Sequence, residues 1–319
     1  MKIIGTGKAV PHKSVSNDML AGFLDTSDEW ISTRTGIRTR RIMTEEHLED
    51  LAAEAAQLAL DRAGLKPADL DFVVCSNVAN NYVTPSLSAM VQKTLGSSCP
   101  CIDLNGACAG FIYALDFAEA YLQTGRARHI LVLCAEEPSL FCDWHQRETC
   151  VLFGDGAGAV VVTPGNDLLS LRLTASPNKD VIHYRRRLEF NPYEQSGRSV
   201  DEPLVLHGRE VFRMAVESSK SDLLQVMQQA GVTAAEVDYF LLHQANLRIS
   251  TAIREQLGQP EEKFPSNIER YGNTSSASIP ILLDELWRGG AIKRDTLLVL
   301  SAFGAGFVTG AAVLKISDN

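Results

Sequence analysis

The chain contains 319 residues, of which 45% are apolar and 22% are charged, and its formal net charge is −9. This length and composition are typical of a soluble globular enzyme with one large domain or two fused domains. The negative charge argues against nucleic acid as a general partner, and no apolar run approaches the ~20 residues of a membrane-spanning helix.

The N-terminal residues and the cysteines favour a cytoplasmic protein with reduced thiols. Residues 1–7 are predicted to enter a strand directly, so no signal peptide is expected. The seven cysteines are odd in number and scattered, which argues against a disulfide framework. Cys99 and Cys101 are too close together for a convincing metal site, and no histidine pair has ligand spacing, so no metal ion is expected.

Apolar periodicity predicts alternating helices and strands in the first half of the chain. Helical spacing covers residues 48–63 and 85–95, whereas residues 71–75 and 129–134 are short apolar runs typical of buried strands. This alternation favours an α/β fold in which helices form layers on a mixed sheet.

The segment Asp103–Phe111 places Cys108 among small residues, just before a helix predicted over residues 112–122. The partial positive charge of a helix N-terminus favours thiolate over thiol, and small neighbours leave room for a thioester. Cys108 is therefore a candidate nucleophile, although a buried inert cysteine is the commoner role for a single free thiol.

The glycine-rich residues 154–158 have the composition of a nucleotide-binding loop. They lead into the apolar residues 159–162, which are predicted to form a strand, whereas a phosphate-binding loop opens a helix. Nucleotide binding is therefore rejected.

Residues 177–207 are polar and lack periodicity, and they are interpreted as a loop-rich link between the halves. A helix is predicted over residues 208–230 and a strand over residues 238–242, directly before His243. A small polar turn around Asn273 opens a further helix over residues 275–288. Taken singly, His243 fits a core histidine and Asn273 a helix cap.

The two halves share an internal duplication. Residues 63–72 align with residues 230–239 at an offset of 230 − 63 = 167, and residues 130–133 align with residues 297–300 at the same offset, 297 − 130 = 167. The offset also takes Cys108 to Ser275, two residues after Asn273. Equivalent halves are thus expected to place their functional turns at equivalent helix starts.

A cysteine with a distant histidine and asparagine is a known arrangement for covalent acyl chemistry. The blocks around Cys108 (NGACAGF), His243 (HQANLRI) and Asn273 (YGNTSSAS) resemble the active-site blocks of the ketoacyl-acyl carrier protein synthase III family. Residues 27–38, 153–159 and 303–307 are similar to further blocks of this family, in the same order.

The resemblance implies a fold, a reaction and a set of partners. The expected fold is α/β, the thiolase-like five-layer α-β-α-β-α arrangement, with an N-terminal half at residues 1–165 and a C-terminal half at residues 166–319. The expected reaction is a decarboxylating Claisen condensation of a short acyl-coenzyme A with malonyl-acyl carrier protein, which gives 3-oxoacyl-acyl carrier protein and initiates fatty acid synthesis. A cytoplasmic homodimer without a resident cofactor is expected.

The resemblance also assigns roles to individual residues. The catalytic residues are Cys108, His243 and Asn273, with the backbone amides of Cys108 and Gly304 as oxyanion donors. Residues expected to bind coenzyme A and its pantetheine arm are Trp30, Arg34, Thr35, Arg147, Phe212, Ala245 and Asn246. The acyl pocket is assigned to Thr84, Pro138, Phe153 and Phe303, and carrier-protein docking to Arg213, Arg248 and Arg254.

Departures from the family pattern keep other functions open. Thr84 replaces an aromatic residue expected to cap the partner subunit's acyl pocket, and Pro138 replaces an aliphatic one. A specialised synthase is therefore the alternative, one that condenses a larger or dicarboxylic primer in biotin-precursor or secondary-metabolite synthesis. A degradative thiolase is disfavoured because the last cysteine is Cys150. A non-catalytic acyl-binding protein would form no covalent adduct.

Overall fold

The computed structural model describes residues 1–185 and 204–317, which build two mixed β-sheets. The first sheet has the strand order β1-β7-β6-β4-β5 and consists of β1 (Lys2–Ala9), β4 (Phe72–Ser76), β5 (Cys101–Leu104), β6 (Ile130–Glu136) and β7 (Gly156–Thr163). The second has the order β11-β12-β13-β8 and consists of β8 (Leu168–Asn178), β11 (Tyr239–Leu242), β12 (Leu297–Gly304) and β13 (Gly306–Lys315).

The pairing pattern confirms the internal duplication. In the first sheet β4 pairs with β6 in parallel, and β6-β7 and β7-β1 are antiparallel. In the second sheet β11 pairs with β12 in parallel, and β12-β13 and β13-β8 are antiparallel. Only β5 has no counterpart, because the offset 268 − 101 = 167 takes it to the short helix α9 (Ile268–Tyr271).

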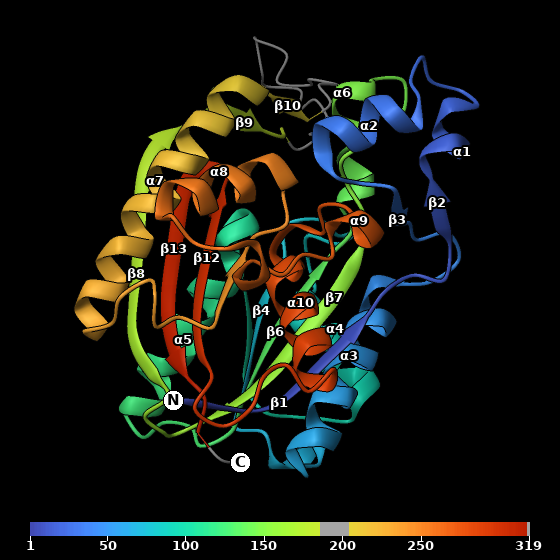
Figure 1. Cartoon of the computed structure of the whole chain (residues 1–319). Helices are drawn as coiled ribbons and strands as arrows, with labels where there is room; N and C mark the ends of the chain where they lie inside the picture. The colour runs from blue at the N-terminus through green and yellow to red at the C-terminus, as the bar shows by residue number, and fades with distance from the viewer. Residues whose placement is uncertain (186–203, 318–319) are drawn as a thin grey trace, which may run out of the picture.

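Helices complete a five-layer α-β-α-β-α arrangement, which confirms the predicted fold (Figure 1). The middle layer contains α5 (Gly110–Gln123) and α10 (Ser278–Arg288), which contact strands of both sheets. The outer face of the first sheet is covered by α3 (Leu48–Ala63) and α4 (Leu87–Leu95). The outer face of the second sheet is covered by α7 (Gly208–Ala230) and α8 (Leu247–Leu257).

Burial of both sheet faces explains why the central strands are apolar without alternation. Along β6, Ile130, Val132 and Cys134 pack in the middle core, and Leu131 and Leu133 pack under the outer helices. The nearly all-apolar sequence of α5 likewise matches its position between two sheets, since a helix that is apolar all round is a buried helix.

The smaller elements lie at the edges of this framework. A two-stranded sheet pairs β2 (Ser14–Ser16) with β3 (Thr39–Arg41), and another pairs β9 (Ile182–His183) with β10 (Val205–Leu206). Short helices are α1 (Asn17–Ala21), α2 (Asp28–Thr35), α6 (Arg147–Cys150) and the 3-10 turns η1 (Pro67–Asp69), η2 (Ala107–Ala109), η3 (Pro138–Phe141), η4 (Glu261–Lys263) and η5 (Ser275–Ala277).

The interpretation of residues 177–207 as the link between the halves was wrong for its described part. The strand β8 begins before this segment, extends into it as far as Asn178 and already belongs to the second sheet, so the connection between the two sheets is residues 164–167. Residues 186–203 of the segment lie outside the described residues. The division into domains 1–165 and 166–319 stays a prediction.

The duplication also shifts by one residue at the functional turns. The turns η2 and η5 begin at Ala107 and Ser275, an offset of 275 − 107 = 168, and these two residues have similar positive φ angles of 46° and 51°. Cys108 is therefore structurally equivalent to Ser276 and not to Ser275, the residue that the offset of 167 predicts.

Candidate active site

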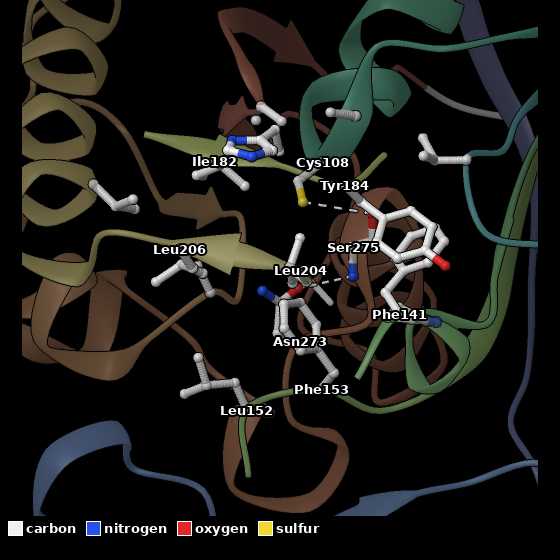
Figure 2. A pocket seen from close by; sticks show the side chains of 18 of the residues that line it. Cys108, Phe141, Leu152, Phe153, Ile182, Tyr184, Leu204, Leu206, Asn273 and Ser275 are labelled. Carbon is white, nitrogen blue, oxygen red and sulfur yellow. Dashed lines mark hydrogen bonds between the residues drawn. The ribbon is translucent and has the colours of Figure 1, made fainter. Parts of the chain in front are cut away.

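Most of the predicted site residues line one cavity of about 1290 Å³, although they come from distant parts of the chain (Figure 2). Its lining includes Trp30, Arg34, Thr35, Cys108, Pro138, Phe153, Phe212, His243, Ala245, Asn246, Asn273, Phe303 and Gly304. The duplicated turns η2 and η5, in contact with each other beside the end of β12, bring Cys108 and Asn273 to the same end of the middle layer.

Cys108 lies in η2, two residues before the start of α5, and lines the cavity. Its position at the helix start predicted a lowered thiol pKa. Burial has the larger effect and raises the pKa of Cys108 to about 12. That prediction of a thiolate was wrong, because the protein atoms packed around this half-buried side chain disfavour the charged thiolate more than the helix start favours it.

Ser275 and Glu136 are residues that the sequence reasoning missed. The Ser275 hydroxyl lies 3.5 Å from Cys108 Sγ and 3.2 Å from Glu136 Oε1. Glu136 is fully buried at the end of β6, and burial raises its pKa to about 7. The sequence did contain a signal for Glu136, because a carboxylate that directly follows the apolar residues 130–135 is expected to be buried. A buried carboxylate must be surrounded by hydrogen-bond donors.

His243 is held as a neutral imidazole. It is buried at the end of β11, packs edge-on against the ring of Phe303, and its Nδ1 lies 2.7 Å from Ser278 Oγ. Burial lowers the pKa of His243 to about 3. Ser278 Oγ also accepts a hydrogen bond from the Gln244 amide at 3.3 Å. When the Ser278 proton is donated to Nδ1, the remaining imidazole proton is on Nε2, which makes that atom a donor.

Asn273 is fixed by backbone and side-chain hydrogen bonds at once. Its N–H donates to Leu152 O at 2.8 Å, and its carbonyl accepts from Gly154 N at 3.1 Å. Its side-chain Oδ1 accepts from Ser275 N at 2.8 Å, as the dashed line in Figure 2 shows. Because the oxygen is used in this way, the amide NH₂ is the part of Asn273 that remains available as a donor in the cavity.

Gly304 permits a close approach between the end of β12 and the turn η2. A Cβ atom at Gly304 would lie 2.6 Å from Cys108 N and 2.8 Å from Ala107 Cβ, distances that real Cβ atoms do not adopt. The absence of a side chain therefore allows the backbone of Gly304 to lie against the backbone of Cys108 and Ala107.

At one end of the cavity, two arginine guanidinium groups lie over the ring of Trp30. The guanidinium carbons of Arg34 and Arg147 lie 4.7 and 4.8 Å from the centroid of the Trp30 ring. Arg147 does not line the cavity itself, and it also donates to the backbone oxygen of Asp25. Thr35 lines the cavity, but its hydroxyl donates to Ile31 O at 2.7 Å within α2.

The predicted acyl-pocket residues separate into two groups. Pro138, Phe153 and Phe303 line the cavity, whereas Thr84 is exposed and does not line the cavity of its own chain. The neighbours Tyr82 and Val83 do line it. Thr84 thus lies outside the enclosed part of the site within one chain.

The three arginines predicted to bind a carrier protein lie on α7 and α8. Arg213 and Arg248 are exposed next to the cavity-lining residues Phe212 and Asn246. Arg213 pairs with Glu217 at 3.3 Å, and Arg254 pairs with Glu255 at 3.7 Å and Glu261 at 3.6 Å. Acidic neighbours therefore reduce the positive potential of two of the three side chains.

The described part of the chain contains neither a metal-binding cluster nor a membrane-spanning helix. Within residues 1–185 and 204–317, no group of three or more His, Cys, Asp or Glu side chains is arranged to hold a metal ion. In the same part of the chain, none of the helices has the length and apolar character needed to cross a membrane.

Comparison with known families and sequences gives matches across the chain. The family described as 3-oxoacyl-[acyl-carrier-protein (ACP)] synthase III matches residues 102–177, and the family of its C-terminal region matches residues 227–316. The beta-ketoacyl-[acyl-carrier-protein] synthase III of Clostridium acetobutylicum is 40% identical over 319 residues, covering 99% of this chain and 98% of the relative. The synthase of Aquifex aeolicus is 41% identical and covers 98% and 99%.

Solved structures agree with the sequence matches. The crystal structure of the Aquifex aeolicus synthase III superposes with a TM-score of 0.91 at 41% identity, covering 98% of this chain and 99% of that one. The Thermus thermophilus enzyme superposes with a TM-score of 0.92 at 38% identity and covers both chains fully. The priming beta-ketosynthase of the R1128 polyketide pathway gives a TM-score of 0.91 at 35% identity, covering 99% and 96%.

Proposed function

Since this chain belongs to the 3-oxoacyl-[acyl-carrier-protein] synthase III family, we propose that it condenses a short acyl-coenzyme A with malonyl-acyl carrier protein. The products are a 3-oxoacyl-acyl carrier protein, carbon dioxide and free coenzyme A, so that the reaction initiates fatty acid synthesis. The observation that carries the proposal is the meeting of Cys108, His243 and Asn273 on one cavity.

In the first half-reaction, Cys108 attacks the thioester carbonyl of the acyl-coenzyme A and forms an acyl-enzyme. The tetrahedral intermediate places negative charge on the former carbonyl oxygen. The adjacent backbone amides of Cys108 and Gly304 are the proposed donors to that oxygen, a proposal supported by the close approach that Gly304 allows. Losing one such donor typically costs about 10²–10³ in rate.

In the second half-reaction, the malonyl thioester loses carbon dioxide and its enolate attacks the acyl group on Cys108. The enolate oxygen requires neutral donors, because no strong base is needed once decarboxylation supplies the carbanion. His243 Nε2 and the Asn273 amide are the proposed donors. The lowered pKa of His243, about 3, supports this role, since the imidazole stays neutral at physiological pH.

Coenzyme A is proposed to enter at the mouth formed by α2 and the α7–α8 end of the cavity. Its adenine would stack on Trp30, with Arg34, Thr35 and Arg147 around it. The planar guanidinium groups already on the Trp30 ring support recognition of a flat aromatic group. The pantetheine arm would then pass Phe212, Ala245 and Asn246 toward Cys108, all of which line the same cavity.

The acyl group is proposed to occupy the part of the cavity lined by Pro138, Phe153 and Phe303. A specialised enzyme with a larger or dicarboxylic primer is the second candidate function. It is favoured by the small polar Thr84, and by the likeness to the R1128 priming ketosynthase at 35% identity. On this reading Thr84 contacts the acyl pocket of a second subunit.

A homodimer is proposed to form through β5, which is an edge strand of the first sheet. Ile102 on β5 and the nearby Tyr82 and Val83 are exposed apolar side chains, which supports an interface there. The carrier protein is proposed to dock on Arg213, Arg248 and Arg254 by electrostatic attraction. A cytoplasmic location without a resident cofactor fits these substrates.

The experiment that tests the function is the intact mass of the protein after exposure to acetyl-, branched, medium-chain and dicarboxylic acyl-coenzyme A donors. A dominant short adduct that is released as a 3-oxoacyl product by malonyl-acyl carrier protein is the expected result. A dominant dicarboxylic or bulky adduct would select the specialised enzyme instead. No adduct with any donor, in wild type as in Cys108→Ala, would contradict both.

A further inference from the structure

A buried carboxylate lies behind the nucleophile and is not used by the proposed condensation. Glu136 is fully buried, and its side chain accepts four hydrogen bonds. Two come to Oε2 from the backbone amides of Val78 at 2.9 Å and Ala79 at 3.1 Å. Two come to Oε1 from Ser276 Oγ at 2.7 Å and Ser275 Oγ at 3.2 Å. None of the four donors is a cation, so the carboxylate charge has no neutralising partner among them.

Ser275 connects this carboxylate to the reacting sulfur, because its hydroxyl lies within 3.5 Å of Cys108 Sγ (Figure 2). The hydroxyl has a single proton and can donate it to one partner at a time. A carboxylate oxygen is a stronger acceptor than a thiol sulfur, so the proton is directed to Glu136. The Ser275 oxygen then presents a lone pair to the thiol, and the three groups are ordered as a donor chain from Cys108 through Ser275 to Glu136.

Among the four donors to Glu136, only Ser275 can also accept a hydrogen bond from Glu136 and donate its own proton to Cys108. The backbone amides of Val78 and Ala79 have no acceptor function at nitrogen, and Ser276 does not contact Cys108 in the hydrogen-bond pattern of the site. When Glu136 is protonated on Oε1, its O–H donates a hydrogen bond to Ser275 Oγ. The Ser275 O–H then points toward Cys108 Sγ. That arrangement stabilises a thiolate on Cys108.

We propose that Ser275 and Glu136 form a proton relay that takes the Cys108 proton during acylation and returns it to the leaving coenzyme A thiolate. The proposal rests on the proposed function for the identity of the acyl donor. In it, Ser275 is a catalytic residue that touches the reacting sulfur, and Glu136 acts through Ser275.

The step balances without any further reactant. The S–H bond of Cys108 breaks, its proton moves to Ser275 Oγ, and the Ser275 proton moves to Glu136 Oε1. The sulfur electron pair forms the bond to the acyl carbon, the bond between that carbon and the coenzyme A sulfur breaks, and the leaving thiolate takes the proton back along the same path. The net products are acyl-Cys108, free coenzyme A thiol and a Glu136 carboxylate that is ready for the next turnover.

The electrostatics around Glu136 suit an acceptor that works near neutral pH. The titratable groups that face it are Cys108 from η2, Cys75 from β4 and Cys134 on its own strand. Burial raises the pKa of both Cys75 and Cys134 well above the usual range, so neither competes for the proton at physiological pH. The pKa of Glu136, raised to about 7 by burial, makes it a stronger base than an ordinary glutamate. That strength matters because desolvation raises the pKa of the half-buried Cys108 thiol and makes it hard to ionise.

Two neighbouring serines provide a matched pair of variants. Ser275→Ala removes the relay and leaves Ser276 bonded to Glu136, whereas Ser276→Ala removes the shorter hydrogen bond and leaves the relay intact. The positive φ of 51° at Ser275 does not prevent an alanine, because Ala107 has φ 46° at the equivalent position of the other half. Glu136→Gln is the third variant, since its carboxamide oxygen still accepts from Val78 and Ala79.

The measurements are single-turnover acylation by acetyl-coenzyme A and alkylation of Cys108 by iodoacetamide, both between pH 5.5 and 9.5, with Cys108 identified by peptide mass. In wild type we expect both rates to rise with pH through a midpoint near 7. Ser275→Ala and Glu136→Gln should lose this rise and acylate about 10- to 100-fold more slowly at pH 7.5. Ser276→Ala should keep the rise with its midpoint at higher pH, because the carboxylate loses a stabilising donor.

The two reagents separate failure of the relay from failure of the proposed function. Wild-type rates and pH profiles in Ser275→Ala and Glu136→Gln would overturn the relay while acylation itself stands. A wild type that shows the iodoacetamide profile and its loss in these variants, but no acyl adduct, would support the relay and contradict the proposed function. A wild-type rate of alkylation by iodoacetamide that does not rise near pH 7 would overturn the relay directly.

Discussion

Replacing Gly304 by alanine tests the arrangement of the proposed oxyanion donors. The new methyl group would lie 2.6 Å from Cys108 N and 2.8 Å from Ala107 Cβ, and both contacts involve backbone or near-backbone atoms that cannot rotate away. An ordinary contact begins at about 3.4 Å. The end of β12 and the turn η2 must therefore separate by roughly 0.8 Å, the difference between the ordinary contact distance of 3.4 Å and the 2.6 Å to Cys108 N.

Such a separation has a structural and a catalytic consequence. Overpacking in a well-packed region typically destabilises a protein by about 1–3 kcal/mol. A displaced oxyanion donor typically lowers the rate by about 10²–10³, which corresponds to about 2.7–4 kcal/mol of transition-state stabilisation. Because tetrahedral intermediates occur in both half-reactions, we expect acylation and condensation to fall together in Gly304→Ala.

The assay is rapid-quench acylation by acetyl-coenzyme A, followed by condensation of the preformed acyl-enzyme with malonyl-acyl carrier protein. The control is Gly231→Ala at the end of α7, where φ is 69° and the space around a Cβ atom is open. An alanine in this left-handed conformation costs roughly 1–2 kcal/mol, so the control loses folding stability without contact with the site. If folded Gly304→Ala retained both rates within threefold of Gly231→Ala, the proposed donor pair would be refuted.

Three further results are expected. Cys108→Ala should form no acyl adduct by intact mass, and a persisting thioester would exclude Cys108 as the nucleophile. Asn273→Ala should acylate at the wild-type rate but condense about 10²–10³ more slowly, because only the enolate needs that amide; an equal loss in both steps would contradict the assignment. With pre-acylated protein, the plot of condensation rate against pH should show no inflection near 6.5, the usual histidine pKa. Burial lowers the pKa of His243 to about 3, so the imidazole is neutral both below and above pH 6.5. An inflection near pH 6.5 that disappears in His243→Gln would contradict this assignment.

The sequence predicted the framework well where the local pattern and the final environment agree. The helix predicted over residues 48–63 is α3, and the helix predicted over residues 208–230 is α7, with the same boundaries. Both helices end at a glycine with positive φ, which is a local signal. The apolar run predicted as a strand at residues 129–134 corresponds to β6. It is apolar at every position because both faces of this sheet are buried.

Local patterns were insufficient where two distant segments had to be placed against each other. The segment at residues 177–207 resembles a linker by composition, but the pairing of β8 with β13 shows that the second sheet starts before it. The one-residue shift between the turns η2 and η5 is likewise invisible in an alignment, because it arises from backbone geometry and not from side-chain pattern.

The sequence by itself predicted which residues carry the chemistry, from the residue types and the order of the blocks around Cys108, His243 and Asn273. Only the tertiary structure decided what state those groups are in. Burial raises the Cys108 pKa and lowers the His243 pKa, and burial is a property of the assembled layers. The contact from Cys108 through Ser275 to Glu136 joins η2, η5 and the end of β6, segments that are adjacent only because two duplicated halves pack on a common middle layer.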